Sequence, residues 1–529
     1  MGCGNSINRF KGVGNINRRK ILTGALTLTA AGVITRVLGF VYRIYMSNIM
    51  GAEGMGLYQL IMPIYALAWS IACAGFNTTV SKLTAQERAR GEYGNMSRML
   101  KQSVIITTIL GFVLTGVLYF GAELVAVHFF GDRRTLLPLQ ILALAFPFMA
   151  AGTCMRGYFI GLQEATVPAI NQVLEQIVRM VIIYFLAAQF VPRGLEFAAA
   201  VAVIAIVGEE IFSCIFVFVA YKFHKKKKRS LFLRPTITSQ QSFVLIMAMA
   251  LPLTGNRVAG SLLSAWENVL IPQRLQMYGL SATEAISEFG RITGMAVPLI
   301  FFPTAVLTAL SVTIVPAVSE AIASNKIHHI SGVASKAMLF AAITGMGATS
   351  LFLFFSYELG IAIYNQPIGF MLQMLGIMCP FIYMQIILSG VLNGLGLQMF
   401  IFRNSLISSG ICIAFIYLFV PHFGLVAYIF GWLISLIVVI GLGLNKIRAY
   451  MPLEMHFTKW FLRPLLAAAA AGLLARYLAD AWLLEIAGIR FGLAVAIVVL
   501  LSIYLGGVLL TGCISKDEIQ RLFSKAKTN

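Results

Sequence analysis

Eight arginines lie inside long apolar stretches of the sequence, where a charged side chain is costly. An arginine at the middle of a membrane span costs roughly 2.5–3.5 kcal/mol, so each needs an acidic partner, a water-filled cavity or an anionic ligand. A guanidinium is planar and permanently charged, and it can bind two phosphate oxygens at once. Arginines without a partner therefore predict an anionic, phosphate-bearing substrate. The eight are Arg36, Arg43, Arg156, Arg179, Arg257, Arg274, Arg291 and Arg476.

Four of these arginines are candidates for a binding cavity. Arg36 and Arg43 are seven residues apart, which places them on one face of a helix, and no acidic residue lies in their stretch. Arg291 opens a later stretch and has Glu288 three residues before it as a candidate partner. Arg257 lies near the start of the stretch before that. We predict that all four line an aqueous cavity and contact the substrate.

The other four arginines have simpler explanations. Arg179 follows Glu175 by four residues, so the two side chains are expected to form an ion pair on one helix. Arg156 lies near the inner end of its stretch and is expected to reach the membrane interface. Arg274 and Arg476 lie near outer ends, and their long side chains can extend to the headgroups.

Three acidic residues in apolar stretches support a different function. Glu209, Glu210 and Glu267 could bind a coupling cation or proton, as a cation-coupled exporter of small drugs requires. The seven cysteines are scattered at no metal-ligand spacing, so no metal site is predicted.

The apolar stretches that carry these charges recur along the whole chain. Of the 529 residues, 59% are hydrophobic and 11% are charged, whereas a soluble domain is about 45–50% apolar and about 25% charged. Each stretch is roughly 20 residues long, enough to cross about 30 Å of hydrocarbon as a helix. The short alternating segments of a β-barrel are absent. We predict an all-α integral membrane protein with about fourteen transmembrane helices.

The basic residues are distributed unevenly between the two sets of loops. The chain has a net charge of +20. If the N-terminus lies inside, 28 of the 40 Lys and Arg residues fall in or beside inner loops and four in outer loops. Inner loops of membrane proteins are enriched in Lys and Arg. We therefore expect both termini in the cytoplasm and no nucleic-acid partner.

The two halves of the chain resemble each other at an offset of 233 residues. Pro147 then coincides with Pro380, and Asn171 with Asn404, while Gly157 and Gly161 coincide with Gly390 and Gly394. Matched Pro, Gly and Asn argue against chance alignment of apolar sequence. An even number of spans in each repeat gives parallel repeats about an axis along the membrane normal, an arrangement found in several transporters.

The repeat predicts two pseudo-symmetric lobes of six helices each. The predicted segments are a cytoplasmic N-terminus at 1–21, an N-lobe at 22–221, a basic cytoplasmic linker at 222–242, a C-lobe at 243–445, two further helices within 446–512 and a cytoplasmic tail at 513–529.

Several motifs resemble a known family of transporters. They are Thr35-Arg36-Val37-Leu38-Gly39-Phe40, Gly51-Ala52-Glu53-Gly54, Val315-Pro316-Ala317-Val318-Ser319-Glu320 and Ser389-Gly390-Val391-Leu392-Asn393-Gly394. These resemble the polysaccharide and peptidoglycan-precursor flippases, the family that includes stage V sporulation protein B, within the multidrug/oligosaccharidyl-lipid/polysaccharide exporter superfamily. The resemblance covers about 20–515.

The resemblance implies a V-shaped fold similar to multidrug exporters and to the MurJ-type lipid II flippases. It implies alternating-access transport of an undecaprenyl-pyrophosphate-linked sugar such as lipid II across the cytoplasmic membrane of a bacterium, for spore cortex synthesis, with no enzymatic reaction. Arg36, Arg43 and Arg291 match cavity arginines of those flippases, although Tyr42-Arg43-Ile44 lacks the acidic residue that often follows the matching arginine. The last two helices would form a groove for the lipid tail.

Three functions therefore stay open at this point. The first is the flippase, with the lipid-linked sugar and membrane lipids as partners, cell-wall synthesis proteins as further candidates, no cofactor, and coupling to the membrane potential or to Na⁺ or H⁺. The second is the cation-coupled multidrug exporter. The third is a scaffold for cell-wall or coat assembly that transports nothing.

Overall fold

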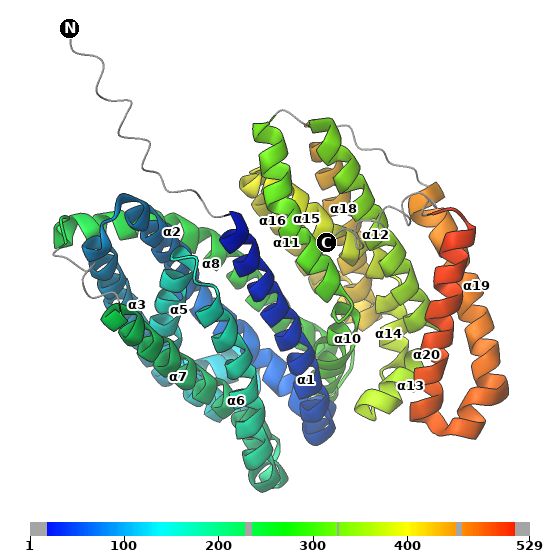
Figure 1. Cartoon of the computed structure of the whole chain (residues 1–529). Coiled ribbons are helices and arrows are strands. Elements are labelled where there is room, and N and C mark those ends of the chain that lie inside the picture. Colours follow the sequence, from blue (N-terminus) through cyan, green and yellow to red (C-terminus); the bar gives the residue numbers. More distant parts are fainter. Residues whose placement is uncertain (1–17, 228–234, 325–326, 451–457, 514–529) are drawn as a thin grey trace. The chain divides into compact units, whose positions relative to one another are not determined.

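The computed structural model describes residues 18–227, 235–324, 327–450 and 458–513. Their regular structure is entirely helical, with no strand in the described residues (Figure 1). The predicted all-α fold is therefore confirmed. Parts of the predicted N-terminal segment, the basic linker, the segment 446–512 and the C-terminal tail lie outside the described residues.

The first half of the chain contains seven α-helices, α1 to α7, and four short π- or 3₁₀-helical segments, η2 to η5, in its described residues. They are α1 (Arg18–Trp69), η2 (Ser70–Ala74), α2 (Gly75–Arg90), α3 (Tyr93–Leu124), η3 (Val125–Phe130), η4 (Arg133–Thr135), α4 (Leu136–Ala143), α5 (Phe146–Gly161), α6 (Thr166–Phe190), η5 (Val191–Arg193) and α7 (Leu195–Lys227).

The second half continues with a similar succession of helices. They are α8 (Ser239–Met277), α9 (Ala282–Phe289), η7 (Gly290–Ala296), α10 (Val297–Phe301), α11 (Thr304–Ala323), α12 (Ile327–Phe354), α13 (Ser356–Leu359), η8 (Gly360–Tyr364), α14 (Gly369–Gly376), α15 (Cys379–Gly394), α16 (Gln398–Leu418), α17 (Val420–Phe423), α18 (Leu425–Arg448), η9 (Thr458–Leu462), α19 (Arg463–Leu478), η10 (Ala479–Leu483) and α20 (Leu484–Leu510).

The helices are long and apolar enough to make this a multi-pass membrane protein. Among the described residues, eleven helical segments qualify as spans, and two bent pairs, Arg133–Ala143 with Phe146–Gly161 and Gly369–Gly376 with Cys379–Gly394, add two more. One of the eleven, Thr27–Arg90, has 64 residues. A straight helix of that length would measure roughly 95 Å, three times the hydrocarbon thickness. It is divided at Gly51, whose backbone is non-helical (φ 68°, ψ −172°). The total agrees with about fourteen spans.

The described residues form two compact units. The first contains the described residues up to Gly39 together with Leu60–Ala265, and the second contains Phe40–Gln59 and the residues from Trp266 onward. These limits differ from the predicted lobes in two segments. The beginning of α8, predicted to belong to the second lobe, packs in the first unit. Residues 40–59, predicted to belong to the first lobe, pack in the second unit.

Close helix contacts explain both exchanges. A Cβ atom at Gly75 would lie 2.4 Å from the carbonyl oxygen of Ala250 on α8, so the two backbones nearly touch. A Cβ atom at Gly56 would lie 2.1 Å from the carbonyl oxygen of Ile286 on α9. Glycine lets helix backbones approach closely inside membranes, and these contacts fix each segment to its unit.

The predicted internal repeat is visible in the helix breaks. Helices α4 and α5 meet at an angle of 46°, and α14 and α15, 233 residues later, meet at 51°. Proline at the second position of α5 and of α15 has no N–H with which to continue the preceding helix. In each unit a threonine hydroxyl donates to a carbonyl near the break, Thr115 to Ala143 at 2.6 Å and Thr349 to Gly376 at 2.8 Å.

Glycine contacts repeat in the same way. A Cβ atom at Gly157 on α5 would lie 2.6 Å from the carbonyl oxygen of Asn77, and one at Gly390 on α15 would lie 2.8 Å from that of Ser311. Each unit thus crosses one equivalent pair of helices at a glycine. The helix bends and the glycine crossings thus recur at the offset of 233 residues on which the predicted duplication rests.

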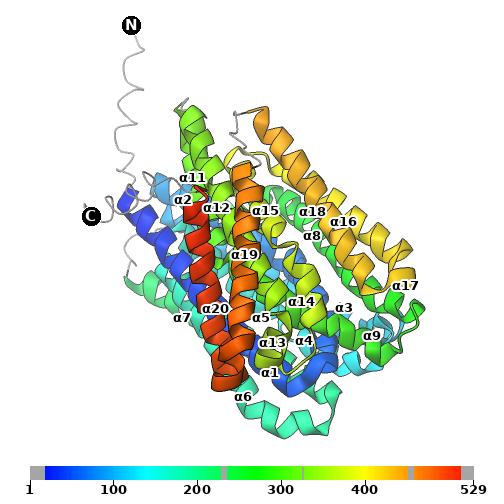
Figure 2. The ribbon, with the colours of Figure 1, turned by 90° about the vertical axis from the view of Figure 1, so that its right-hand side faces the viewer.

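The two helices outside the repeat, α19 and α20, lie side by side and pack on α12 (Figures 1 and 2). Small residues of α19, including Ala468 and Ala471, form the contact. The hydroxyl of Tyr504 on α20 donates to the carbonyl of Ile343 at 2.6 Å, and that of Ser350 donates to the carbonyl of Ala468 at 2.7 Å.

We expect alanine at Gly157 or Gly390 to destabilise the helix crossings, because the added Cβ meets a backbone oxygen closer than any normal contact. The expected cost is about 1–3 kcal/mol. Thermal unfolding of the detergent-purified protein measures it. Alanine at Gly116 or Gly410, where a Cβ meets nothing within 4 Å, is the matched control. Equal melting temperatures for all four variants would contradict the assigned crossings.

Candidate functional site

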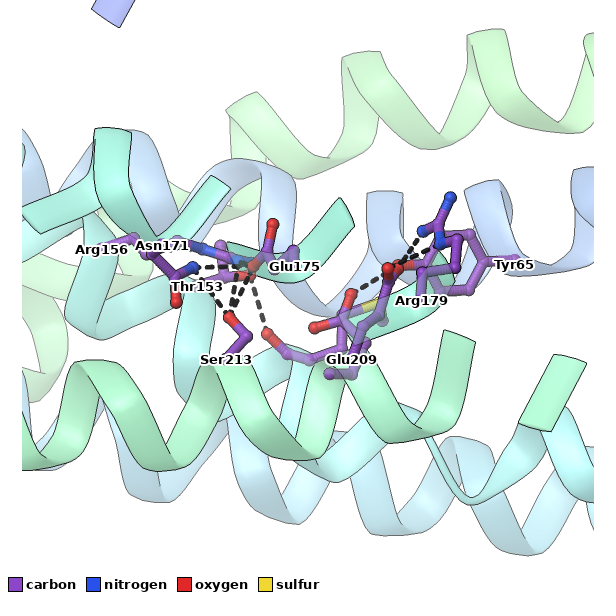
Figure 3. Close-up of polar contacts among 10 residues, drawn as sticks. Tyr65, Thr153, Arg156, Asn171, Glu175, Arg179, Glu209 and Ser213 are labelled. Atoms are coloured by element: carbon purple, nitrogen blue, oxygen red, sulfur yellow. Dashed lines mark hydrogen bonds and ion pairs between the residues drawn. The ribbon is translucent and has the colours of Figure 1, made fainter. Parts of the chain in front are cut away.

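Helices α5, α6 and α7 of the first unit bring a network of charged and polar side chains together inside the span (Figure 3). Arg156 on α5 forms an ion pair with Glu175 on α6 and donates to the hydroxyl of Ser213 on α7 at 3.0 Å. Asn171 donates to Glu175 at 2.7 Å and to Ser213 at 2.9 Å. Ser213 itself donates to Glu175 at 2.6 Å. Three helices are therefore joined around one carboxylate.

A second group of charges continues this network along α6 and α7. Arg179 binds Glu209 through two nitrogens, with Nε 2.6 Å from Oε2. The hydroxyl of Tyr65, on α1, donates to Oε1 of Glu210 at 2.5 Å. Positions 171, 175 and 179 are four residues apart, so they share one face of α6. This spacing explains how one helix supplies both groups.

The network borders a cavity of about 370 Å³ within the first unit. Three carboxylates and two guanidiniums line it, those of Glu175, Glu209, Glu210, Arg156 and Arg179, so its formal charge is −1 when all are ionised. Three buried lining oxygens lack a hydrogen-bond donor among the described residues: Oε2 of Glu210, Oδ1 of Asn171 and Oε1 of Gln176. An excess of acceptors with net negative charge suits a proton or a cation.

The predicted partners of these arginines need correction. Sequence reasoning paired Arg179 with Glu175 on the same helix, but its bidentate partner is Glu209, thirty residues later. Glu175 instead binds Arg156, which was expected to reach the membrane interface and has only 19% of its side chain exposed. A charged side chain among apolar helices is costly unless it is paired. The ion pair with Glu175 on the neighbouring helix therefore stabilises Arg156 in its buried position.

The two outer arginines also have specific contacts instead of simply extending to the headgroups. Arg476 forms ion pairs with Glu358 at 2.5 Å and Asp480 at 2.9 Å. Arg274 stacks on the ring of Tyr417, with its guanidinium carbon 3.8 Å from the ring centre. A stacked guanidinium gains a cation–π contact.

The predicted pair of Arg291 and Glu288 is present in the second unit. Their side chains are 2.6 Å apart and about a quarter exposed. They line a cavity of about 560 Å³ that also contains Glu284. The backbone N–H of Ser281 and its hydroxyl both donate to Glu284, which lowers the pKa of this carboxyl. Nε of Arg291 is buried without a hydrogen-bond acceptor among the described residues.

The remaining predicted site residues are distributed over both units. Arg36 and Arg257 are exposed and belong to the first unit, whereas Arg43 is half-buried and belongs to the second. The helix is continuous between Arg36 and Arg43, as their predicted shared face requires. Glu267 is half-buried on α8. The structure therefore gathers Glu209 and Glu210 in one network, and places Glu267 in the other unit.

Three residues of the network were missed by sequence reasoning. Asn171 carried a signal, because it lies in an apolar helix and has a counterpart in the repeat, Asn404. Tyr65 and Ser213 carried none, since Tyr and Ser are common in membrane helices and their partners lie on other helices.

Comparison with known proteins identifies the family. Residues 21–321 match the family described as polysaccharide biosynthesis protein. Stage V sporulation protein B of Bacillus subtilis (strain 168) is 31% identical over 451 residues, which are 84% of this chain and 87% of that protein. The chain belongs to the polysaccharide biosynthesis protein family. The lipid II flippase MurJ of Bacillus subtilis (strain 168) is also similar to this chain. The two are 26% identical over 370 residues, which are 66% of this chain and 65% of that protein.

Solved structures show that this family member shares its fold with two kinds of transporter. A structure of the lipid II flippase MurJ in an inward closed conformation has a TM-score of 0.64, with 13% identity, 91% of this chain and 98% of that chain covered. An inward-facing multidrug resistance MATE transporter of the MOP superfamily also has a TM-score of 0.64, with 13% identity, 80% of this chain and 98% of that chain covered. The predicted fold is therefore confirmed. Because both structures match equally well, the fold alone does not distinguish a lipid II flippase from a multidrug exporter.

We expect Arg179→Leu to destabilise the protein by about 3–5 kcal/mol, because it leaves the Glu209 carboxylate buried without its cation. The double variant Arg179→Leu/Glu209→Leu should recover most of that loss. Unfolding of the purified protein by dodecyl sulfate measures both.

The control for this pair is Arg133→Ala. Arg133 and Glu123 are 3.7 Å apart, and their side chains are 77% and 69% exposed, so this substitution should cost about 0–1 kcal/mol. A double variant no more stable than Arg179→Leu alone would show that the two residues do not act as a pair.

Proposed function

We propose that the protein is a flippase that moves a lipid-linked oligosaccharide across the cytoplasmic membrane of a bacterium. Its substrate class is a prenyl-pyrophosphate-linked sugar such as lipid II, supplied for peptidoglycan synthesis, including that of a spore cortex. The kinship with stage V sporulation protein B and with the lipid II flippase MurJ supports this cargo over a small drug. No covalent bond changes, so the protein is not an enzyme.

The observation that carries the proposal is the exposure of arginines on apolar helices. Arg36 and Arg257 are exposed, and Arg43 is half-buried, although each lies in a span-length helix. Exposure to lipid would cost roughly 2.5–3.5 kcal/mol for each, whereas water or a pyrophosphate group removes that cost. The exposed guanidiniums of Arg36 and Arg257 are therefore accessible to an anionic ligand.

Arg291 is a further candidate contact for the pyrophosphate group. It is held by Glu288 at 2.6 Å, and its Nε–H is directed to no acceptor among the described residues. A pyrophosphate oxygen can accept from Nε while the ion pair persists, because a guanidinium offers five donors. Arg291 can therefore contact substrate without first losing Glu288.

The direction of transport follows from charge. With the termini inside, as the basic loops indicate, the inside-negative potential drives the anionic head group outward. A potential of 100 mV is worth about 2.3 kcal/mol for each charge moved. The same potential favours the return of an empty, positively charged binding site. We propose that the two lobes alternate between inward-open and outward-open states during this cycle.

We expect Arg36→Ala to slow translocation of lipid II by about tenfold or more, which is the loss of one charge-assisted hydrogen bond of at least about 1.4 kcal/mol. Proteoliposomes containing fluorescent lipid II measure it, with a membrane-impermeant quencher reporting the outer-leaflet fraction. Arg36→Lys should retain part of the activity.

The control is Arg193→Ala, which removes an exposed loop arginine that stacks on Phe190 and should leave translocation unchanged. Undiminished transport by Arg36→Ala would remove the assigned role. Absence of transport by the wild-type protein itself would refute the flippase.

Coupling to a cation is the second proposal for this protein, favoured by the cavity of the first unit. The cavity has a formal charge of −1 and an Oε2 of Glu210 without a donor among the described residues. A proton or Na⁺ bound there would neutralise it. Such a site fits either a cation-coupled flippase or a multidrug exporter.

We expect Glu210→Gln to abolish the response of transport to a Na⁺ or pH gradient, because the amide neutralises the cavity permanently. Transport driven by the membrane potential alone should persist. Proteoliposomes with one imposed gradient at a time measure this. Glu123→Gln, an exposed carboxylate, is the control, and a full gradient response in Glu210→Gln would exclude the site. Efflux of small cationic drugs without movement of lipid II would instead support the exporter.

A further inference from the structure

The second unit contains a cavity of about 260 Å³ between α15, α16 and α18. Six polar side chains line it, and its lining includes no Lys, Arg, Asp or Glu. They are Gln385, Ser389, Asn404, Ser405, Ser408 and Ser409. Amides and hydroxyls both donate and accept hydrogen bonds. The cavity is therefore polar without being charged.

This cavity is the counterpart in the repeat of the charged cavity in the first unit. At the offset of 233 residues, Asn404 corresponds to Asn171 and lines its cavity in the same way. None of the five charged residues is kept: Ser389 stands where the first unit has Arg156, and Ser408 where it has Glu175. Arg179, Glu209 and Glu210 correspond to Cys412, Leu442 and Gly443. The repeat has thus preserved the location of a polar cavity and exchanged its chemistry.

Asn171 and Asn404 differ in the hydrogen bonds that their side-chain amides make. Asn171 donates to Glu175 at 2.7 Å and to Ser213 at 2.9 Å. Asn404 is only 4% exposed, yet its amide makes no hydrogen bond within the described residues. This amide lines the cavity, so it is available to a hydrogen-bonding partner that enters there.

Most other polar groups around this cavity are equally unused. Ser408 donates to the Ser435 hydroxyl at 3.2 Å. In the described part of the chain, Gln385, Ser389, Ser405 and Ser409 make no side-chain hydrogen bond. In the first unit, two of the corresponding positions, Arg156 and Glu175, form an ion pair with each other. The second unit therefore has free hydroxyls where the first unit has that ion pair.

We propose that this cavity binds one sugar ring of the transported lipid through its hydroxyl and amide groups. The assignment rests on the proposed flippase function and names the part of the substrate that the arginines do not recognise. A pyrophosphate is a poor occupant, because the lining supplies no cation. A metal cation is also a poor occupant, because the lining supplies no carboxylate.

The size and position of the cavity agree with this occupant. Pockets for drug-sized ligands have about 300–1,000 Å³, so 260 Å³ admits one small group and not a whole oligosaccharide. Ser389 lies near the end of α15 and Asn404 near the start of α16, beside the turn 395–397. The predicted orientation places this turn on the cytoplasmic side, where a lipid-linked sugar would be loaded.

The test is direct binding of a free sugar to the purified full-length protein in nanodiscs. Saturation-transfer NMR should detect N-acetylglucosamine bound to the wild type. Asn404→Leu keeps the branching and the number of non-hydrogen atoms and removes the amide donor and acceptor, so it should weaken sugar binding by about tenfold or more. Ser408→Ala/Ser409→Ala should weaken it as well, which keeps the test valid if Asn404→Leu does not fold.

Two controls make the result specific. Leu406→Ala removes an exposed side chain of the same helix that does not line the cavity, and it should leave sugar binding unchanged. Binding of inorganic pyrophosphate should be the same in Asn404→Leu and in the wild type. No sugar binding to the wild type at tens of millimolar, or equal binding to Asn404→Leu, would overturn the proposal.

The binding test also separates this inference from the flippase function. A wild-type protein that binds N-acetylglucosamine through Asn404 but moves no lipid II would retain the sugar site and refute the flippase. A wild type that moves lipid II, together with an Asn404→Leu variant that moves it equally fast, would retain the flippase and refute the sugar site.

Discussion

A charge within an apolar span must be compensated by another side chain, by water or by a ligand, and this constraint organises the first unit. The carboxylate of Glu175 accepts hydrogen bonds from Arg156, Asn171 and Ser213, which come from three helices. Removing any helix would leave a charge or an amide without its partner. Apolar packing alone tolerates sliding of one helix on another, whereas this arrangement of donors around one carboxylate fits a single register. The network is therefore a determinant of specific helix packing as well as a candidate site for a cation.

Comparison of the two repeats separates the features that the helix scaffold requires from those that are free to differ in function. Both units have a bent helix pair, a threonine that satisfies a carbonyl at the bend and a glycine at the next crossing. These features depend on backbone geometry, so each duplicate needs them. The polar lining of the cavities is not required by the backbone, and there the units differ. Arg156 and Glu175 correspond to Ser389 and Ser408, a change that removes both members of an ion pair together. Losing only one member would have left a buried charge, which is far more costly than losing both.

The sequence predicted what is local and missed what depends on the packing of separate helices. The pair of Arg291 and Glu288 could be predicted because three residues on one helix bring two side chains together without any tertiary information. The same reasoning paired Arg179 with Glu175 on one helix. In the structure Arg179 binds Glu209 and Glu175 binds Arg156, both on neighbouring helices. The number of spans and the repeat were predictable because hydrocarbon thickness and matched prolines are encoded linearly. The placement of the beginning of α8 in the first unit and of residues 40–59 in the second was not predictable. It depends on contacts of Gly75 and Gly56 with other helices, which the sequence pattern does not indicate.

A lipid-linked oligosaccharide presents two different chemistries, an anionic pyrophosphate and neutral sugar rings, and a transporter must satisfy each without binding either too tightly. Arginines bind phosphate strongly, and a site made of them alone would release the cargo slowly. Neutral hydroxyls and amides bind sugar rings weakly and exchange readily with water, because the water they displace makes similar hydrogen bonds. An uncharged cavity therefore adds recognition of the head group at little cost to release. The charged cavity of the first unit cannot serve that purpose, because its donors are already committed to carboxylates. On this view the duplication allowed one cavity to keep its charges for stability and coupling while its counterpart lost them and became available to the cargo.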